Sequence, residues 1–132
     1  MAAIEFLQIE VLLAIHVDQT TRYGGDASIR DLGLLESAIS QPQASFGENY
    51  LHAFPFEMAA AYLFHIVMNH PFVDGNKRTG TVAALVFLDW NGYEIHAQPG
   101  ELSDLTLGVT AGKLNKADVA KWLEDHHSKL TP

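Results

Sequence analysis

Apolar residues recur every three or four positions along several parts of the chain, which is the spacing of one face of an α-helix. The first such stretch starts at Ile4 and stops before Tyr23-Gly24-Gly25, whose glycine pair breaks helices. A second stretch opens at Arg30 and Asp31 and is halted by Pro42. We therefore predict two amphipathic helices in this part of the chain, each with its apolar side turned to the core.

The middle of the sequence contains two further apolar stretches, separated by residues 70–80. Pro55 suits the first turn of a helix, and a wide apolar stripe follows it up to His70. A second apolar helix is predicted after the interruption, ending where Asn91 and Gly92 favour a left-handed cap. These two helices are expected to be central and buried, and to hold the segment between them.

Further helices are predicted at residues 101–112 and after Asn115, which Asp118 follows at the spacing of a capping box. Residues 43–54 lack a helical period and are predicted to form a surface loop or a small hairpin. No internal repeat or linker divides the sequence. Together these patterns predict an all-α fold of about six helices in one domain, residues 1–132.

The composition suits a compact intracellular protein. Of the 132 residues, 48% are hydrophobic, which is enough to bury a core. The absence of cysteine excludes a disulfide framework, a cysteine-based zinc site and a cysteine nucleophile. The first residues include two glutamates and no basic leader, and no apolar run approaches the length of a membrane span. We expect a soluble, cytoplasmic protein.

The charge is acidic, with 8 Lys and Arg against 16 Asp and Glu and a net charge of -8. Binding to DNA or RNA in general needs an extended basic surface, so this balance disfavours a nucleic-acid factor. Between positions 31 and 112 the only cations are Lys77 and Arg78. Two adjacent cations isolated in an acidic chain predict a local anion site.

The letters HPFVDGNKRTG, from His70 onward, predict a helix end, a tight loop and a new helix start. Pro71 disfavours continuation of the helix, and Asp74-Gly75-Asn76 is typical of a turn. Backbone N–H groups at a helix start have no partner inside the helix, and the helix dipole adds to their attraction for anions. Gly75, through close backbone approach, and Asn76, through its amide, are predicted to form a nest for phosphate.

The same segment contains the other groups that phosphate chemistry needs. Asp74 supplies a hard oxygen ligand for Mg2+, which usually completes its shell with water and substrate phosphates. His70 can accept a proton near neutral pH. Lys77 and Arg78 can neutralise charge that develops on phosphate oxygens. This combination predicts the transfer of a phosphoryl or nucleotidyl group to a hydroxyl.

Each of these residues also has a plainer interpretation. A histidine near a helix end is usually a cap, and Asp-Gly-Asn alone is a common turn. Cations at a helix start oppose the helix dipole and need a nearby anion, so the assembled segment favours a functional role. Phe72 is predicted to be a hydrophobic anchor of the loop rather than a ligand contact. No role is assigned to the scattered single histidines His16, His52, His65 and His96.

The segment HPFVDGNKRTG resembles the signature of Fic domains, H-P-F-x-[D/E]-G-N-G-R-x-x-R, and more closely its variant in the Doc (death-on-curing) toxins. The Doc-like variant has Lys after Asn and lacks the final Arg, and these positions are Lys77 and Thr81 here. The resemblance extends through RYGGDASIRDLGLLESAISQPQ before the segment, and through FLDWNGYE and ELSDLTLGVTAGKL after it. It therefore covers nearly the whole chain.

This resemblance implies the all-α Fic fold and a toxin of a toxin–antitoxin module. Such a toxin uses ATP and Mg2+ to modify a Ser or Thr hydroxyl of a bacterial protein, for which elongation factor Tu is a candidate. A flap within residues 43–54 is expected to line the site. By resemblance, the catalytic base is His70, the metal ligand is Asp74, and the nucleotide-binding residues are Gly75, Asn76, Lys77 and Arg78.

Two departures from the general Fic pattern decide which reaction is predicted. In AMP-transferring relatives a Gly, here Lys77, lets the backbone approach the phosphate chain, and an Arg, here Thr81, holds the terminal phosphate. We therefore predict a protein kinase that transfers the γ-phosphate of ATP. The alternatives are an AMP-transferase, since Gly75 keeps one feature of that motif, and a silent module that only binds a nucleotide or a partner.

Regulation is predicted from a missing element. Many Fic proteins carry an inhibitory helix with [S/T]-x-x-x-E-[G/N], whose Glu pairs with the second Arg of the signature. No Ser or Thr of this sequence is followed at that spacing by Glu-Gly or Glu-Asn, and the Arg position is Thr81. We therefore predict inhibition in trans by a separate, Phd-like antitoxin that binds in an exposed apolar groove.

Overall fold

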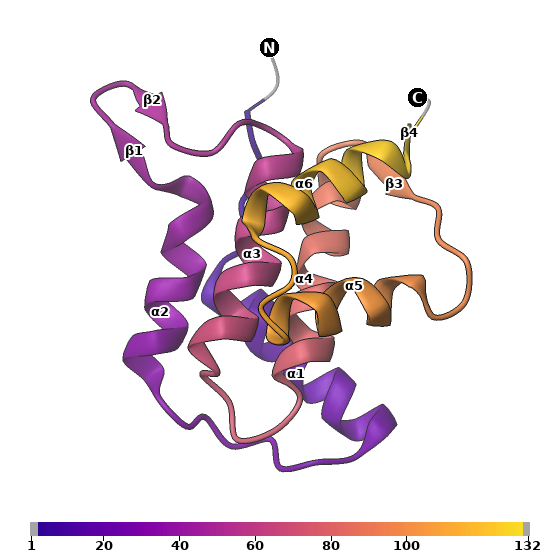
Figure 1. The fold of residues 1–132 in the computed structure, drawn as a ribbon. Helices are drawn as coiled ribbons and strands as arrows, with labels where there is room; N and C mark the ends of the chain where they lie inside the picture. The colour runs from indigo at the N-terminus through magenta and orange to yellow at the C-terminus, as the bar shows by residue number, and fades with distance from the viewer. Residues whose placement is uncertain (1–2, 131–132) are drawn as a thin grey trace.

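The computed structural model describes residues 3–130, so the predicted domain limits at residues 1 and 132 lie outside it. The described chain folds into six α-helices, one short 3-10 helix and two small antiparallel sheets (Figure 1). The helices are α1 (Ile9–Tyr23), α2 (Leu32–Ser40), η1 (Gln41–Gln43), α3 (Phe56–Asn69), α4 (Asn76–Trp90), α5 (Glu101–Thr110) and α6 (Lys116–Asp125). The strands are β1 (Ser45–Phe46), β2 (Asn49–Tyr50), β3 (Tyr93–Ile95) and β4 (His127–Lys129). The predicted mostly helical fold of about six helices is confirmed.

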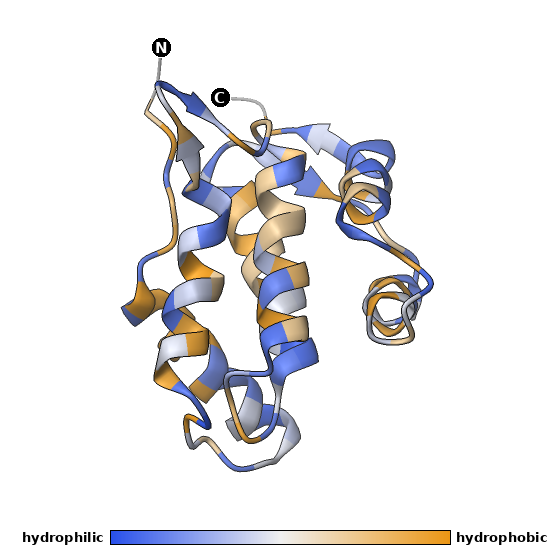
Figure 2. Cartoon of the chain, turned by 60° about the vertical axis from the view of Figure 1, so that its left-hand side comes forward, coloured by the Kyte–Doolittle hydropathy of each residue, from blue (hydrophilic) through white to orange (hydrophobic). Residues whose placement is uncertain are grey.

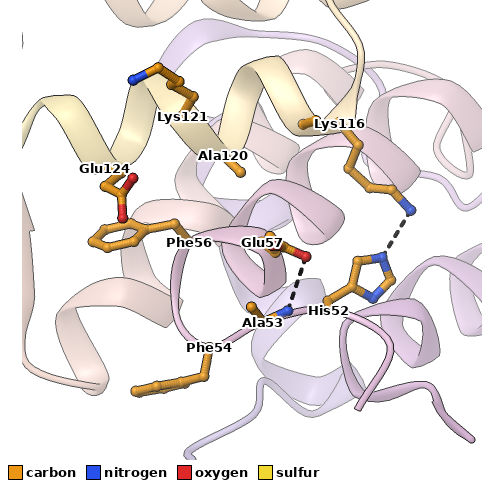
Figure 3. A pocket seen from close by; sticks show the side chains of 10 residues that line it. His52, Ala53, Phe54, Phe56, Glu57, Lys116, Ala120, Lys121 and Glu124 are labelled. Atoms are coloured by element: carbon orange, nitrogen blue, oxygen red, sulfur yellow. Dashed lines mark hydrogen bonds between the residues drawn. The ribbon is translucent and has the colours of Figure 1, made fainter.

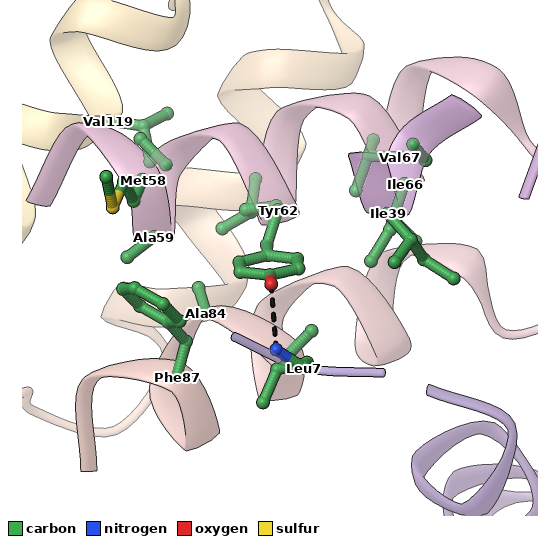
Figure 4. Packing of buried hydrophobic residues seen from close by; sticks show 14 of the residues in the cluster. Leu7, Ile39, Met58, Ala59, Tyr62, Ile66, Val67, Ala84, Phe87 and Val119 are labelled. Carbon is green, nitrogen blue, oxygen red and sulfur yellow. Dashed lines mark hydrogen bonds between the residues drawn. The ribbon is translucent and has the colours of Figure 1, made fainter. Parts of the chain in front are cut away.

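Helices α3 and α4 form the centre of the molecule and run in opposite directions on either side of residues 70–75 (Figure 1). Figure 2 shows the hydrophobic positions, in orange, along these helices between hydrophilic positions in blue. Tyr62 of α3 and Phe87 of α4 are fully buried, with ring centroids 5.3 Å apart (Figure 4). A Cβ on Gly80 would lie 3.0 Å from Cγ2 of Val67, so the small residue lets the helices approach closely near the loop.

The first helix begins later than the sequence pattern predicts. It starts at Ile9 rather than Ile4, and the residues before it lie in an extended segment. The N–H of Leu7 donates to the phenolic oxygen of Tyr62 over 2.9 Å, and the Leu7 side chain is fully buried (Figure 4). These contacts with α3 outweigh the local helical period, because tertiary packing decides where helical propensity is weak. Burial raises the pKa of Tyr62 to about 12.

Residues 43–54 contain a small hairpin, which is one of the two structures predicted for this segment. Strands β1 and β2 pair Ser45 with Tyr50 and Phe46 with Asn49, and Gly47 in the turn has a positive φ of 63°. The hairpin lies beside the start of α3, whereas the segment from His70 follows the end of that helix (Figure 1). A helix of 14 residues is about 20 Å long, so the hairpin and this segment stand far apart.

The C-terminal third covers one side of the central pair. The capping box predicted at the start of α6 is present: the side chain of Asn115 accepts from the N–H of Asp118, and Asp118 accepts from the N–H of Asn115. Helix α5 packs against both α3 and α4, and β3 pairs with β4. Among residues 3–130, no helix combines the length and apolar character needed to cross a membrane. The position of α5 matters most for function, because it faces the start of α4.

Candidate active site

The loop between α3 and α4 starts with an unusual backbone conformation at His70. This residue ends α3 in the left-handed region, with φ 50° and ψ 54°, and within residues 3–130 no other non-glycine residue has a positive φ. Such a conformation costs about 1–3 kcal/mol for a residue with a side chain and persists only where the surroundings impose it. Its side chain is exposed and lines a pocket of about 560 Å³.

Arg30 imposes this conformation from outside the loop. Its Nε donates to the carbonyl oxygen of His70 over 2.6 Å, and its Nη2 donates to that of Asn69 over 3.0 Å. These bonds satisfy carbonyl groups at the end of α3 that no helical N–H reaches. Sequence reasoning placed Arg30 only at the opening of α2, because nothing in the spacing shows that it folds back onto the loop.

The segment before α2 also runs antiparallel to the loop. The N–H of Arg30 donates to the carbonyl oxygen of Pro71 over 2.7 Å, and the N–H of Val73 donates to that of Ser28 over 3.0 Å. Ile29 and Phe72 form an isolated β-bridge between these bonds. This short pairing ties the loop to residues 28–31, a contact that the sequence analysis did not predict.

The expectation that residues 43–54 line the site is wrong. None of them borders the pocket at His70, and the hairpin lies at the opposite end of α3. His52 and Phe54 of this segment border a different pocket, of about 440 Å³, together with Lys116 of α6 (Figure 3). The sequence pattern identified the hairpin but could not give its position, because the direction of a loop depends on contacts distant in the chain.

Gly75 begins the second half of the site. It is the N-cap of α4 with φ 82° and ψ 13°, a conformation that glycine adopts without strain. The first helical bond runs from the N–H of Thr79 to the carbonyl oxygen of Gly75, 2.9 Å. The N–H groups of Asn76, Lys77 and Arg78 therefore precede the first bonds of the helix, and all three residues border the pocket. This is the local geometry that the sequence predicts for a phosphate site.

All six predicted site residues border this one pocket. They are His70, Asp74, Gly75, Asn76, Lys77 and Arg78. Ser103 and Thr110 of α5 border it from the other side and were not predicted. The pocket thus lies between the end of α3, the start of α4 and the exposed hydroxyl groups of α5.

Asn76 holds the loop in a way that differs from the prediction. Its Oδ1 accepts from the N–H of Phe72 and its Nδ2 donates to the carbonyl oxygen of Phe72, each over 2.9 Å. The side chain is only 4% exposed, so its amide is occupied inside the loop rather than presented to a ligand. What Asn76 can offer to an anion is its backbone N–H at the first position of α4.

Asp74 has one carboxylate oxygen engaged and one available. Its Oδ2 accepts from the N–H of Asp26 over 2.9 Å, and its exposed side chain borders the pocket. Among the described residues no three His, Cys, Asp or Glu side chains gather closely enough to hold a metal by themselves. One hard oxygen beside the start of a helix fits Mg2+ that is shared between a carboxylate and a phosphate ligand, and it does not fit a cage made by the protein alone.

The two cations of the loop are exposed and have no acidic partner. Within residues 3–130 neither Lys77 nor Arg78 forms an ion pair. The guanidinium carbon of Arg78 lies 4.9 Å from the ring centroid of Tyr23, so α1 helps to hold it at the pocket. Two unpaired cations at a helix start, where the dipole already repels them, favour the binding of an anion.

Phe72 and His16 support the loop from beneath, and only the role of Phe72 was predicted from the sequence. Phe72 is fully buried, which confirms the prediction that it anchors the loop. His16 of α1, to which no role was assigned, stacks on it with ring centroids 3.6 Å apart and an angle of 9° between the planes. The one sequence signal for its burial is its position four residues after the buried Leu12, which places both side chains on the same face of the helix.

An apolar groove of about 340 Å³ adjoins the site. It shares Lys77, Arg78 and Ser103 with the pocket at His70. Its walls come from the end of α1, from α4 and from α5, and its larger apolar side chains are Tyr23, Val82, Leu85, Leu102 and Leu107. The hydroxyl of Thr81 at its edge lies 2.6 Å from that of Thr106 and donates to the carbonyl oxygen of Lys77 over 2.8 Å. Thr81 therefore ties α4 to α5 where a second arginine of the general Fic pattern would stand.

A polar cluster lies away from the site. Nζ of Lys116 is 2.9 Å from Nε2 of both His52 and His65, and Figure 3 shows the bond to His52. Burial, followed by the charge of Lys116, lowers the pKa of His65 to about 4. Burial likewise lowers the pKa values of His52 and Lys116. With both imidazoles neutral, each can accept a hydrogen bond from the ammonium group, which joins α6 to α3.

Comparison with known proteins gives the family of this fold and site. The family model described as Fic/DOC family matches residues 6–88, which include the whole loop between α3 and α4. The chain belongs to the Fic/DOC family. It is 38% identical over 114 residues to "Protein kinase doc" of Escherichia phage P1, covering 86% of this chain and 89% of that protein. It is 44% identical over 78 residues to "Toxin Doc" of Mycolicibacterium smegmatis, covering 57% of this chain and 58% of that protein.

Proposed function

We propose that the chain is the toxin of a toxin–antitoxin module and a protein kinase. In this proposal it transfers the γ-phosphate of ATP to a Ser or Thr hydroxyl of a bacterial protein in the cytoplasm, with elongation factor Tu as the first target to test. The observation that carries the proposal is the convergence of a histidine, a free carboxylate oxygen, two unpaired cations and a helix start on one pocket. The names of the two relatives, one a kinase and one a toxin, support it.

In the proposed reaction the terminal phosphates of ATP lie over the start of α4. The N–H groups of Asn76, Lys77 and Arg78 bind their oxygens, and the side chains of Lys77 and Arg78 stabilise the charge that develops in the transition state. Asp74 would hold Mg2+ through its free oxygen, and the ion would supply charge neutralisation on the phosphates of the nucleotide. Binding and electrostatics therefore account for most of the catalysis.

His70 acts on the incoming hydroxyl. Its exposed imidazole accepts the proton as the hydroxyl oxygen bonds to the γ-phosphorus, and the bond from that phosphorus to the bridging oxygen of ADP breaks. The products are a phosphorylated side chain, ADP and a protonated His70. The left-handed backbone of His70, fixed by Arg30, holds the base at the rim of the pocket, where a hydroxyl of another protein can reach it.

Transfer of the γ-phosphate rather than AMP is supported by Lys77 and Thr81. Lys77 places a bulky cation where AMP-transferring relatives have glycine, and the hydroxyl of Thr81 is occupied by contacts with Thr106 and Lys77. Neither residue provides the grip on the terminal phosphate that would present the α-phosphorus. A nucleotide in the reverse orientation instead places its γ-phosphate beside both cations.

Incubation with γ-labelled ATP, Mg2+ and a bacterial lysate tests the enzymatic part of the proposal. One protein should acquire label, purified elongation factor Tu should acquire it in the same way, and a chelator of Mg2+ should prevent both. A lysate without any labelled protein contradicts a kinase. Expression of the chain alone in bacteria tests the toxin part, because translation should stop; unaffected growth contradicts it.

The adjoining groove is the proposed site of the antitoxin. It is apolar, it lies between three helices, and it shares both cations with the pocket, so a segment bound there would cover the phosphate site. A Phd-like segment that folds on binding suits such a groove. Leu107 is 48% exposed at its edge. Leu107→Glu should leave the toxin active but reduce its neutralisation by a coexpressed antitoxin, and full neutralisation of this variant argues for another site.

A further inference from the structure

His16 contacts the loop from beneath through the face of its ring and through a ring nitrogen. Its side chain is only 1% exposed on α1, and its ring lies against Phe72 in a nearly parallel stack. Its Nε2 lies 2.7 Å from the backbone carbonyl oxygen of Asp74, 58 residues along the chain. A Cβ on Gly75 would lie 3.5 Å from the same Nε2. The ring is therefore enclosed by the residues on both sides of the Asp74–Gly75 peptide bond.

The direction of this hydrogen bond follows from its partner. A carbonyl oxygen only accepts, so Nε2 of His16 carries the hydrogen and donates it to Asp74. Packing alone does not require this bond, because an apolar ring of the same size would also stack on Phe72. A buried polar ring in this place is favourable because its donor is satisfied by the loop.

The bond also fixes a second group. A trans peptide is planar, so the carbonyl of Asp74 and the N–H of Gly75 point in opposite directions. Because the carbonyl points to the buried ring of His16, the N–H of Gly75 points away from α1, and Gly75 borders the pocket. The same plane sets the start of α4, and it limits the positions that the side chain of Asp74 can take.

We propose that His16 is a positioning residue for the phosphate and metal site. By holding the Asp74–Gly75 peptide, it orients the N–H groups that bind phosphate and the carboxylate that shares Mg2+ with the nucleotide. It touches neither the substrate nor the metal, and it acts through the loop. This inference rests on the proposed use of a nucleotide with Mg2+, but it does not depend on which phosphorus is attacked.

Two substitutions separate the hydrogen bond from the stacking. His16→Phe keeps an aromatic ring against Phe72 and removes the donor, whereas His16→Gln keeps a side-chain N–H of similar reach. Leu12→Val is the matched control, because Leu12 is fully buried on the same helix and should lower stability without affecting the loop. Binding of ADP with Mg2+ is measured by calorimetry at a temperature where thermal unfolding shows each variant to be folded.

We expect His16→Phe to bind ADP with Mg2+ about tenfold more weakly, as for the loss of one hydrogen bond that orders the site, and to need more Mg2+ for binding. His16→Gln should recover most of the affinity, and Leu12→Val should bind like the unmodified chain. Unchanged affinity and Mg2+ dependence in folded His16→Phe would overturn the inference. So would an equal loss in Leu12→Val, because His16 would then contribute only stability.

If His16→Phe does not fold, a second pair decides. His16→Asn presents the same amide as His16→Gln on a side chain one methylene shorter, which is too short to reach the carbonyl of Asp74. Weaker binding by the Asn variant than by the Gln variant supports the inference, and equal binding contradicts it. The measured quantity is binding of ADP with Mg2+, so the role of His16 can be tested even if the chain transfers AMP or transfers no group. Failure of the kinase proposal would appear only in the labelling experiments.

Discussion

Nε of Arg30 lies 2.6 Å from the carbonyl oxygen of His70, the proposed base, across a separation of 40 residues. The bond holds a backbone that is left-handed at His70, and Arg30 also reaches the preceding carbonyl group, that of Asn69. The end of α3 is thereby capped by a side chain that belongs to the segment before α2. The orientation of the base depends on this contact and not on the loop alone.

Arg30→Ala should therefore affect both stability and catalysis. Loss of two charge-assisted bonds at an exposed site should lower the free energy of unfolding by about 1–2 kcal/mol. It should also slow phosphate transfer roughly tenfold, because a misplaced base reacts less often. Urea denaturation and the initial rate of labelling measure the two effects. Arg22→Ala is the control, since Arg22 forms only an exposed ion pair with Asp18, and similar losses in both variants would contradict the role of Arg30.

His70 is best tested by asparagine. Asn adopts the left-handed conformation more readily than most residues with a side chain, so His70→Asn removes the base with little change in the loop. Transfer should fall by about 10²- to 10⁴-fold, the usual contribution of a general base, while binding of ADP with Mg2+ stays unchanged. His96→Asn, at an exposed position directly after β3 and not among the residues that line the pocket, should transfer at the normal rate. Normal turnover in His70→Asn would exclude His70 as the base.

Asn76 should tolerate almost no replacement. Its amide both accepts from and donates to the backbone of Phe72, so Asn76→Asp would place a second carboxylate oxygen against a carbonyl oxygen. We expect a loss of roughly 2–3 kcal/mol in the free energy of unfolding, because a buried group loses its partner, together with weaker nucleotide binding. Asn49→Asp on the exposed hairpin supplies the matched control for added charge. Equal stability of the two variants would show that the bonds to Phe72 are dispensable.

The cluster around Lys116 predicts a dependence of stability on pH. The pKa of His65 is about 4 in the folded chain, below its ordinary value of 6.5, so between these values the unfolded chain binds more protons than the folded one. Stability should therefore be complete above about pH 6.5 and fall as the pH drops toward 4. His65→Gln retains an acceptor for Lys116 without a titrating ring, so it should show a shallower fall in denaturation experiments. A slope equal to that of the unmodified chain would contradict this account.

The parts of the structure that the sequence predicts are those that local rules determine. The central helices follow from their apolar stripes, the capping box of α6 from Asn115 and Asp118, and the pocket from a site whose residues are contiguous. Contacts made from a distance were not predictable in this way. Arg30 and His16 reach the loop from 40 and 58 residues away, and no spacing rule relates such positions.

Two differences show how tertiary contacts override local signals. The residues from Ile4 have a helical period, yet they remain extended because Leu7 is buried against Tyr62. Asn76 has the right position for a ligand contact, yet its amide is used inside the loop because Phe72 offers it both a donor and an acceptor. In each case a contact that the local pattern does not show decides the structure or the use of the side chain.

The central claim is the transfer of phosphate, and its most direct test is the origin of the transferred atoms. The chain is incubated with Mg2+, purified bacterial elongation factor Tu or the labelled lysate protein, and ATP labelled at either the α- or the γ-phosphorus, with His70→Asn as the inactive control. We predict label from the γ-position alone and a mass gain of one phosphate group on a Ser or Thr residue. Label from the α-position with a mass gain of one AMP would contradict the kinase and identify an AMP-transferase.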